Sequence, residues 1–446
     1  MADLSIDMCG IKSPNPFWLA SGPPTNSGEQ VMRAFDAGWG GAVWKTLGEP
    51  IVNVSSRLGA IDYAGARIMG LNNIELITDR PLETNFKEMY AVKKRYPDHA
   101  LIASLMVETK EEWRDIIKRS EDAGADGLEL NFGCPHGMCE RGMGSAVGQE
   151  PRVLAEITSW VKEYAQVPVL VKLTPNVGDI LVPGKAAVAG GADGLSLINT
   201  IKSIIGVNLD TLVPMPTVGS QSSQGGYCGP AVKPIALHMV GALARDPGVT
   251  IPISAIGGIS DWRDAAEFLA LGATSVQVCT AVMHEGYRIV EDMIEGLNYY
   301  LDAGGLASVT DLVGKALPGF TEWGELDLNY NVIAKIDSET CIGCQLCYVA
   351  CLDGAHQCIH TDQGPCSAYH GEPDHGAHPR DVVQPPIWHR NGDSSDPHVP
   401  FVDEQECIGC NLCKLVCPVP GCITMEEVPT SAGKESWNDR LAKGTA

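Results

Sequence analysis

Short apolar runs alternate with amphipathic stretches along residues 1–300 of the chain. The stretches between the runs have apolar residues at helical spacing, as in KEEWRDIIKRSEDAG at 110–124 and in the segment from Tyr287 to Leu301. Alternating strands and helices predict a parallel sheet, and eight such units predict a (β/α)8 TIM barrel. The eight predicted strands span residues 16–21, 41–46, 100–106, 127–132, 167–173, 193–199, 251–258 and 275–281.

The pattern changes after the predicted barrel, which we place at residues 1–303. We expect a linker over 304–334, a small α+β domain over 335–430 and a C-terminal tail over 431–446. Within the small domain, residues 359–400 are rich in Gly, Pro, Asp and His, which is typical of a polar surface insertion. A metal-binding His tract is the alternative interpretation of that insertion.

Charge and composition narrow the class of protein. The 446 residues include 32 Lys and Arg against 55 Asp and Glu, a net charge of −23, which argues against binding the phosphate backbone of nucleic acids. The N-terminus lacks the basic and apolar regions of a secretory signal, and no apolar run approaches the roughly 18 residues of a membrane span. We therefore expect a cytoplasmic protein that binds neither membranes nor nucleic acid.

Cysteines are concentrated near the C-terminus, where 11 of the 16 lie between Cys341 and Cys422. The run C-x2-C-x2-C-x3-C occurs twice there, and this spacing is the signature of a bacterial-type ferredoxin domain with two [4Fe-4S] clusters. Because the fourth Cys of each run binds the other cluster, the predicted ligand sets are Cys341, Cys344, Cys347 and Cys417, and Cys407, Cys410, Cys413 and Cys351. A zinc site is the alternative, and the remaining Cys358, Cys366 and Cys422 are expected to be structural thiols.

Polar residues follow the predicted barrel strands at their carboxyl ends, where the active sites of such barrels lie. The late strands carry Gly225-Gly226-Tyr-Cys-Gly229, Gly257-Gly258 and Cys279-Thr280, whose backbone N–H groups suit a phosphate. No G-x-G-x-x-G dinucleotide fingerprint follows a predicted strand. A mononucleotide is therefore expected, and beside iron–sulfur clusters flavin mononucleotide (FMN) fits the chemistry.

Four motifs resemble the dihydroorotate/dihydropyrimidine dehydrogenase family of flavin barrels: Asn131-Phe-Gly-Cys134-Pro-His-Gly-Met, Lys172-Leu-Thr-Pro-Asn, Asn199-Thr200 and Leu-Asn-Asn73-Ile-Glu-Leu-Ile. The ferredoxin tail narrows the resemblance to the barrel-plus-ferredoxin subunit of NAD-dependent dihydropyrimidine dehydrogenases. The resemblance implies pyrimidine contacts at Asn73, Asn131, Asn199 and Thr200. It implies FMN contacts at Ser21, Lys45, Thr46, Asn131, Lys172, Gly229, Gly257, Gly258, Cys279 and Thr280. It also implies a hetero-oligomer, with FAD and NAD(H) on a partner subunit.

The implied chemistry is oxidoreduction at a CH–CH bond. Asparagine amides match the alternating carbonyl and N–H groups of uracil or thymine. Reducing the 5,6 double bond requires a hydride from flavin N5 to C6 and a proton at C5. We expect Cys134 to give that proton, because a thiol of ordinary pKa near 8.5 is mostly protonated at pH 7. Lys45 and Lys172 are expected to stabilise charge at the N1/C2 edge of the flavin.

Two departures from the family pattern affect the expected substrate. Gly133 stands where relatives usually carry Ser, and Cys139 stands where Gly is common. We interpret the glycine-rich stretch 133–148 as a lid over the ring. Dihydroorotate oxidation and reduction of a different unsaturated amide or CoA-linked substrate are the alternatives. A soluble electron carrier is likewise an alternative to the FAD- and NAD-binding subunit.

Overall fold

The computed structural model describes residues 1–49, 53–63, 66–135, 142–361 and 399–444. The chain divides into two compact units, Met1–Phe320 and Thr321–Ala446. None of the helices in the described part of the chain has the length and hydropathy that crossing a bilayer requires.

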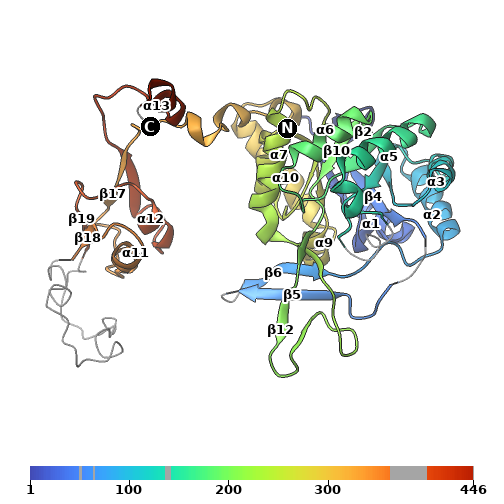
Figure 1. Cartoon of the computed structure of the whole chain (residues 1–446), viewed down its shortest axis with the longest axis horizontal. Coiled ribbons are helices and arrows are strands. Elements are labelled where there is room, and N and C mark those ends of the chain that lie inside the picture. Colours follow the sequence, from blue (N-terminus) through green and yellow to red (C-terminus); the bar gives the residue numbers. More distant parts are fainter. Residues whose placement is uncertain (50–52, 64–65, 136–141, 362–398, 445–446) are drawn as a thin grey trace. The chain divides into compact units, whose positions relative to one another are not determined.

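Eight parallel strands of the first unit close into a barrel, in the order β10-β15-β16-β3-β4-β7-β8-β9. Two of them, β4 and β10, are labelled in Figure 1. Each predicted strand overlaps one of these, so the predicted barrel is confirmed. The strands are buried on both faces, which is why they appear in the sequence as continuous apolar runs. Their bounds are β3 (Phe17–Leu19), β4 (Gly41–Leu47), β7 (Ala100–Leu105), β8 (Gly127–Asn131), β9 (Val169–Lys172), β10 (Gly194–Leu197), β15 (Ile253–Ile256) and β16 (Ala273–Val278).

Helices follow the barrel strands, and some of them begin at a residue whose side chain caps the helix. The helix predicted at 110–124 begins after Thr109, whose side chain accepts a hydrogen bond from the Glu112 N–H in a capping box. The α-helices of this unit are α1 (Gly28–Ala37), α2 (Leu82–Arg95), α3 (Lys110–Asp122), α4 (Ser145–Gly148), α5 (Pro151–Tyr164), α6 (Leu181–Ala189), α7 (Lys233–Arg245), α8 (Trp262–Ala270), α9 (Thr280–Glu285) and α10 (Ile289–Ala303).

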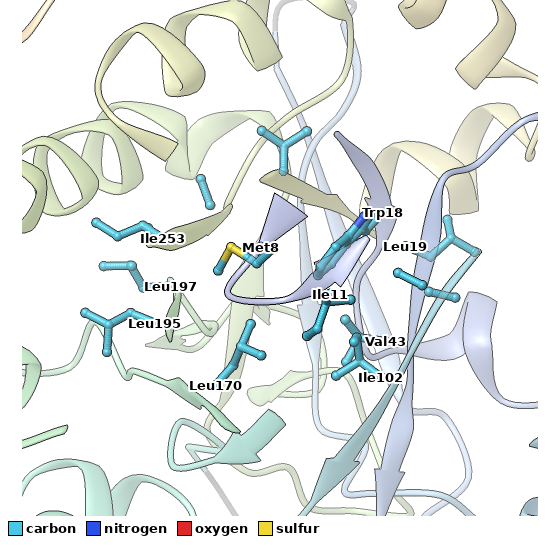
Figure 2. Close-up of a cluster of buried hydrophobic side chains, with 14 of the residues drawn as sticks. Met8, Ile11, Trp18, Leu19, Val43, Ile102, Leu170, Leu195, Leu197 and Ile253 are labelled. Carbon is cyan, nitrogen blue, oxygen red and sulfur yellow. The ribbon is translucent and has the colours of Figure 1, made fainter. Parts of the chain in front are cut away.

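An N-terminal hairpin of β1 (Ile6–Met8) and β2 (Ile11–Ser13) contributes to the barrel core (Figure 2). Met8 and Ile11 are buried, and they lie beside Gly194 and Gly127, the first residues of two barrel strands. The hairpin therefore covers the amino end of the barrel. Burying a side chain of this size contributes about 1.5–3 kcal/mol.

A second, four-stranded sheet belongs to the first unit but lies outside the barrel, in the order β11-β14-β6-β5. Its strands are β5 (Leu58–Tyr63), β6 (Ala66–Asn73), β11 (Ile201–Ser203) and β14 (Gly225–Cys228), and β12 (Gly206–Asn208) pairs with β13 (Val213–Met215) in a separate hairpin. Asn73 ends β6, Thr200 directly precedes β11 and Gly229 directly follows β14. This sheet, which the sequence pattern did not predict, thus carries three predicted site residues.

The second unit is a small α+β fold in which the internal repeat is visible. Strand β17 (Val332–Ile336) pairs with β20 (Ile423–Glu427), and β18 (Ile359–His360) pairs with β19 (Phe401–Val402). The predicted α+β class of this domain is confirmed. Its helices are α11 (Leu346–Gly354), α12 (Leu412–Val416) and α13 (Trp437–Lys443). Most of the predicted insertion, with Cys366, lies outside the described residues.

Candidate functional site

A cavity of about 1100 Å³, counted with its open mouth, lies at the carboxyl ends of the barrel strands. It brings together every barrel residue for which the sequence analysis predicted a contact with a ligand or a catalytic role. These are Ser21, Lys45, Thr46, Asn73, Asn131, Cys134, Lys172, Asn199, Thr200, Gly229, Gly257, Gly258, Cys279 and Thr280. Most of them lie together because the carboxyl ends of parallel barrel strands meet at one face, whereas Asn73, Thr200 and Gly229 reach the cavity from the second sheet.

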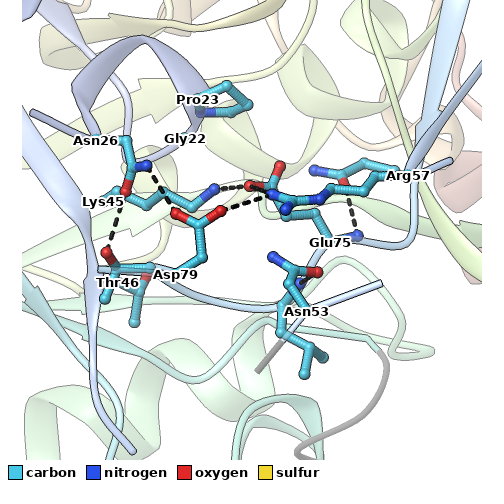
Figure 3. Close-up of polar contacts among 12 residues, drawn as sticks. Gly22, Pro23, Asn26, Lys45, Thr46, Asn53, Arg57, Glu75 and Asp79 are labelled. Atoms are coloured by element: carbon cyan, nitrogen blue, oxygen red, sulfur yellow. Dashed lines mark hydrogen bonds and ion pairs between the residues drawn. The ribbon is translucent and has the colours of Figure 1, made fainter. Parts of the chain in front are cut away.

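The first lysine of the cavity belongs to a charged network (Figure 3). Lys45 on β4 is 4% exposed and forms an ion pair with Glu75. Arg57 Nη1 lies 3.3 Å from Glu75 Oε1 and 3.0 Å from Asp79 Oδ2, so it bridges the two carboxylates. Burial lowers the pKa of the Lys45 ammonium to about 8, and the Asp79 charge opposes that shift.

The second lysine is paired inside the barrel. Lys172 Nζ lies 3.3 Å from Glu129 Oε1, and the Glu129 side chain has no exposed surface. Gln277 Nε2 donates a hydrogen bond of 3.0 Å to Glu129 Oε2 and another of 3.0 Å to Ser254 Oγ. Each cavity lysine therefore has a buried carboxylate as its counter-ion, and the net charge of the two pairs is close to zero.

The amide and hydroxyl groups of the cavity are held by hydrogen bonds to one another. Asn131 Nδ2 donates to Thr46 Oγ1 at 3.0 Å, and the Thr46 hydroxyl also lies 2.9 Å from Ser104 Oγ and 3.2 Å from Ser21 Oγ. Asn131 Oδ1 accepts a hydrogen bond from the Gly133 N–H at 3.2 Å. These contacts fix the orientation of the Asn131 amide before a ligand binds.

Cys134 lies at the edge of the cavity and is 5% exposed. Its side chain packs in a small apolar cluster with Ile77, Met106 and Met143, which keeps water away from the thiol. Its carbonyl accepts a hydrogen bond of 3.0 Å from the Ser145 N–H. Residues 136–141 of the predicted lid, including Cys139, lie outside the described residues, so the lid remains a prediction.

Three glycines of the cavity lining leave room for a bound group to approach the backbone closely. Gly229, Gly257 and Gly258 have φ of 100°, 132° and 76°, which L side chains rarely adopt. A Cβ on Gly258 would also lie 2.9 Å from the Gly229 carbonyl oxygen. This close-packed glycine backbone suits a phosphate group, as the sequence predicted.

A buried side-chain amide of the lining also fits a flavin. Gln277 Oε1 is buried and has no hydrogen-bond partner among the described residues, although the side chain lines the cavity. An unpaired buried acceptor is costly, and a ring N–H group bound in the cavity would satisfy it. Two lysines, the amides and the glycine-rich end therefore match a polar ring system with a phosphate.

Sequence reasoning missed three polar residues of this site, Glu75, Glu129 and Gln277. Glu129 is two residues before Asn131 on the same strand, so the period of two places both side chains on the inner face. Glu75 stands two residues after Asn73 in a motif that was recognised. Both carboxylates were thus detectable from spacing, but their lysine partners depend on how distant segments meet.

Two smaller cavities of the second unit contain the predicted cluster ligands. One, of about 300 Å³, is lined by Cys341, Cys344, Cys347 and Cys417, together with Cys422. The other, of about 340 Å³, is lined by Cys407, Cys410, Cys413 and Cys351, together with Cys358. The structure thus groups the cysteines in the predicted sets, with the fourth Cys exchanged between runs.

A cluster and a single metal ion require different spacings of their ligands. Within the described ranges, no three His, Cys, Asp or Glu side chains are grouped to hold one metal ion. A zinc ion would draw its four thiolates to about 2.3 Å from one centre. A four-iron cluster instead binds one thiolate at each iron, so its ligands surround a wider space.

The chain is similar to several known proteins. Residues 3–301 match the family model described as dihydroorotate dehydrogenase. The chain is 41% identical over 435 residues to the NAD-dependent dihydropyrimidine dehydrogenase subunit PreA of Escherichia coli, covering 97% of this chain and 98% of that protein. It is 42% identical to the chloroplastic dihydropyrimidine dehydrogenase (NADP(+)) of Arabidopsis thaliana, covering 73% of this chain and 79% of that protein.

Two further matches cover the barrel. The catalytic subunit of dihydroorotate dehydrogenase B (NAD(+)) from Pyrococcus horikoshii is 38% identical, covering 70% of this chain and 98% of that protein. A crystal structure of dihydroorotate dehydrogenase from Eimeria tenella, in complex with ferulenol, superposes with a TM-score of 0.58 at 20% identity. It covers 70% of this chain and 88% of that chain, and it supports the barrel fold alone.

Proposed function

The chain belongs to the dihydroorotate dehydrogenase family, and from this premise we propose that it is the barrel-plus-ferredoxin subunit of a dihydropyrimidine dehydrogenase. In this function it interconverts uracil or thymine with the corresponding 5,6-dihydropyrimidine. The match to the E. coli subunit covers 97% of the chain, so it extends well beyond the barrel. The two dihydroorotate dehydrogenase relatives match 70% and 71% of the chain.

The observation that favours a neutral pyrimidine is the pairing of the cavity's cations. Among the described residues, the lining contains two cations, Lys45 and Lys172, and each has a carboxylate partner. A substrate carboxylate, as on dihydroorotate, would have to compete with Glu75 and Glu129 for these cations or be held by backbone N–H groups, because burying an unpaired charge is costly. Uracil and thymine carry no carboxylate, and their imide edge can pair with amides such as Asn73, Asn131 and Asn199.

Cys134 is proposed to move the proton at pyrimidine C5. In the reducing direction the Sγ–H gives its proton to C5, and in the oxidising direction the thiolate removes it. The apolar contacts of Cys134 with Ile77, Met106 and Met143 exclude water from this transfer. When bound, FMN supplies the hydride exchanged with C6.

The remaining residues of the cavity position the two ligands. Lys45 and Lys172, held by Glu75 and Glu129, place positive charge where charge develops on a reduced ring. The end of the cavity proposed to hold the FMN phosphate consists of Gly229, Gly257, Gly258, Cys279 and Thr280. Ser21, Thr46 and Asn131 form one hydrogen-bonded group, so changing one of them disturbs the others.

Electrons are proposed to pass between the barrel and a partner through two [4Fe-4S] clusters. The support is the grouping of Cys341, Cys344, Cys347 and Cys417 around one cavity, and of Cys407, Cys410, Cys413 and Cys351 around the other. The E. coli relative is named as a subunit, so we propose a hetero-oligomer with a subunit that binds FAD and NAD(H).

The direct test is the product formed from each candidate substrate. Chemically reduced holoprotein is incubated without oxygen with uracil, thymine or orotate, and the dihydro products are separated and quantified. We expect dihydrouracil and dihydrothymine. Formation of dihydroorotate alone would replace this proposal with the dihydroorotate activity, and no dihydro product from any of the three would replace it with a different substrate class.

A further inference from the structure

Each cysteine cavity of the second unit contains one thiol more than a cluster needs. Cys358 lines the cavity with Cys351, Cys407, Cys410 and Cys413. It is 5% exposed and directly precedes β18, outside both C-x2-C-x2-C-x3-C runs. The proposed ligand assignment leaves it without a role.

The backbone holds Cys358 against the run that provides three of the ligands. Its carbonyl accepts a hydrogen bond of 2.7 Å from the Asp403 N–H, and the Asp403 carbonyl accepts one of 3.0 Å from the Cys407 N–H. Pairing of Ile359 with Val402 continues this contact into a strand ladder. The position of Cys358 is therefore set by the fold and is not a chance contact.

The other half of the repeat has the same arrangement. The Cys422 carbonyl accepts a hydrogen bond of 2.8 Å from the Asp337 N–H, and the Asp337 carbonyl accepts one of 3.0 Å from the Cys341 N–H. Cys422 is 2% exposed and lines the cavity of its own run. Its Sγ lies 3.8 Å from the Asp337 carbonyl oxygen, so this thiol also has a backbone acceptor.

The Cys358 thiol contacts the sulfur of a proposed ligand directly. Its Sγ lies 3.5 Å from the Cys351 Sγ, and its side chain also interacts with Cys407. A ligated cysteine is a thiolate and has no proton to give. With a cluster bound, Cys358 is therefore the donor and Cys351 the acceptor.

We propose that Cys358 donates an S–H···S hydrogen bond to the cluster ligand Cys351 and thereby raises the reduction potential of that cluster. The inference rests on the proposed function, because it presupposes the two clusters. Hydrogen bonds to cluster sulfurs are one of the means by which proteins set such potentials. Reduction adds negative charge to the cluster and its ligands, so a donor stabilises the reduced form more than the oxidised form.

Two variants separate the hydrogen bond from the bulk of the side chain. Cys358→Ala removes the donor, whereas Cys358→Ser keeps a hydroxyl donor at the same position. Cys422→Ala removes the matching thiol from the other cavity and serves as the control for the cluster held by Cys351. Each full-length holoprotein is titrated anaerobically, with the reduced clusters followed by electron paramagnetic resonance.

For Cys358→Ala we expect one of the two midpoint potentials to fall. The expected loss is about tenfold in the equilibrium constant for reduction, or about 59 mV for a one-electron couple. Cys358→Ser is expected to keep that potential near the wild-type value, and Cys422→Ala to leave it unchanged. Iron and sulfide contents are measured alongside and are expected to stay at two clusters per chain.

Other outcomes would overturn the inference in distinct ways. An unchanged potential in Cys358→Ala would show that the thiol is structural, and an equal fall of the same midpoint potential in Cys422→Ala would show a general effect of altered packing. Loss of one cluster in Cys358→Ala would make Cys358 a ligand. Absence of cluster signals from the wild-type protein would instead contradict the proposed function.

A second measurement observes the proton of the proposed hydrogen bond directly. In wild-type holoprotein exchanged into D2O, electron–nuclear double resonance of the reduced clusters should show an exchangeable proton close to the cluster of Cys351. This signal should persist in Cys358→Ser and be weaker in Cys358→Ala. The same exchangeable signal in all three proteins would contradict the proposed S–H donor.

Discussion

At the residue scale, Cys134 carries the proposed proton transfer. Its replacement by Ala removes the acid but leaves the lysines, amides and glycines of the cavity in place, so FMN should stay bound. We expect turnover of dihydrouracil to fall by about 10²–10⁴-fold, the usual contribution of general acid–base catalysis. Steady-state assays measure the loss, and flavin absorbance measures occupancy. Near-normal turnover would remove Cys134 from the mechanism.

The ion pair of Lys172 and Glu129 leads to a prediction about the free energy of unfolding. Because Glu129 is fully buried, Lys172→Met leaves an uncompensated carboxylate and should destabilise the FMN-free barrel by about 3–5 kcal/mol. The double variant Glu129→Gln with Lys172→Met removes both charges and should recover most of that loss. Chemical denaturation measures the three proteins. Equal stability of the single and double variants would show that the two residues do not interact.

The lowered pKa of Lys45 leads to a prediction about how the flavin reduction potential depends on pH. Burial lowers its pKa to about 8, so the positive charge is present below that pH and is lost as the pH rises through it. The charge stabilises reduced flavin, so the wild-type flavin potential should fall more steeply with pH above about 8 than below it. Spectroelectrochemical titration tests this against Lys45→Met with FMN bound. If Lys45→Met shows the same change in the slope of potential against pH, that change belongs to another titrating group.

At the element scale, the sheet β11-β14-β6-β5 positions part of the pyrimidine end. A Cβ on Gly226 of β14 would overlap the Thr200 side chain. Gly226→Ala should therefore displace Thr200, weaken one substrate contact and raise KM for uracil about tenfold with little change in kcat. Gly178→Ala, at an exposed position with open space around it, is the matched control. An unchanged KM in Gly226→Ala would argue against a role for Thr200.

The contrast between barrel and outer sheet shows what the sequence could predict. Barrel strands such as β7 and β9 are buried on both faces, and their apolar runs are visible locally. Strand β11 has three residues and β14 contains two glycines, so neither has the alternation of a typical strand. Strand β14 pairs with β6, about 150 positions away in the chain, and such pairings leave no local signal.

The candidate site divides in the same way. Cys134, Asn131 and Lys172 were predicted because they stand in short motifs at strand ends. Glu129 and Glu75 matter through their lysine partners, and those contacts depend on strand register and on a loop returning to the barrel mouth. The grouping of eight cysteines around two cavities was predicted from the sequence, because the spacing of each run gives three members of a set and the repeat gives the exchanged fourth.

At the scale of the whole molecule, the two units should respond separately to loss of iron. Among the described residues, five of the eight buried members of the second unit's hydrophobic cluster are cysteines, so this cluster is completed by whatever those thiols bind. Removing iron from the full-length protein should abolish one calorimetric transition and leave that of Met1–Phe320. Loss or an equal shift of both transitions would show that the units unfold as one.

The central claim is that this barrel oxidises dihydropyrimidines. The most direct measurement follows flavin absorbance when oxidised holoprotein is mixed anaerobically with dihydrouracil, dihydrothymine or dihydroorotate, each in a separate experiment. We predict bleaching of the flavin by dihydrouracil and dihydrothymine, and none by dihydroorotate. Bleaching by dihydroorotate alone, or by none of the three, would contradict the account.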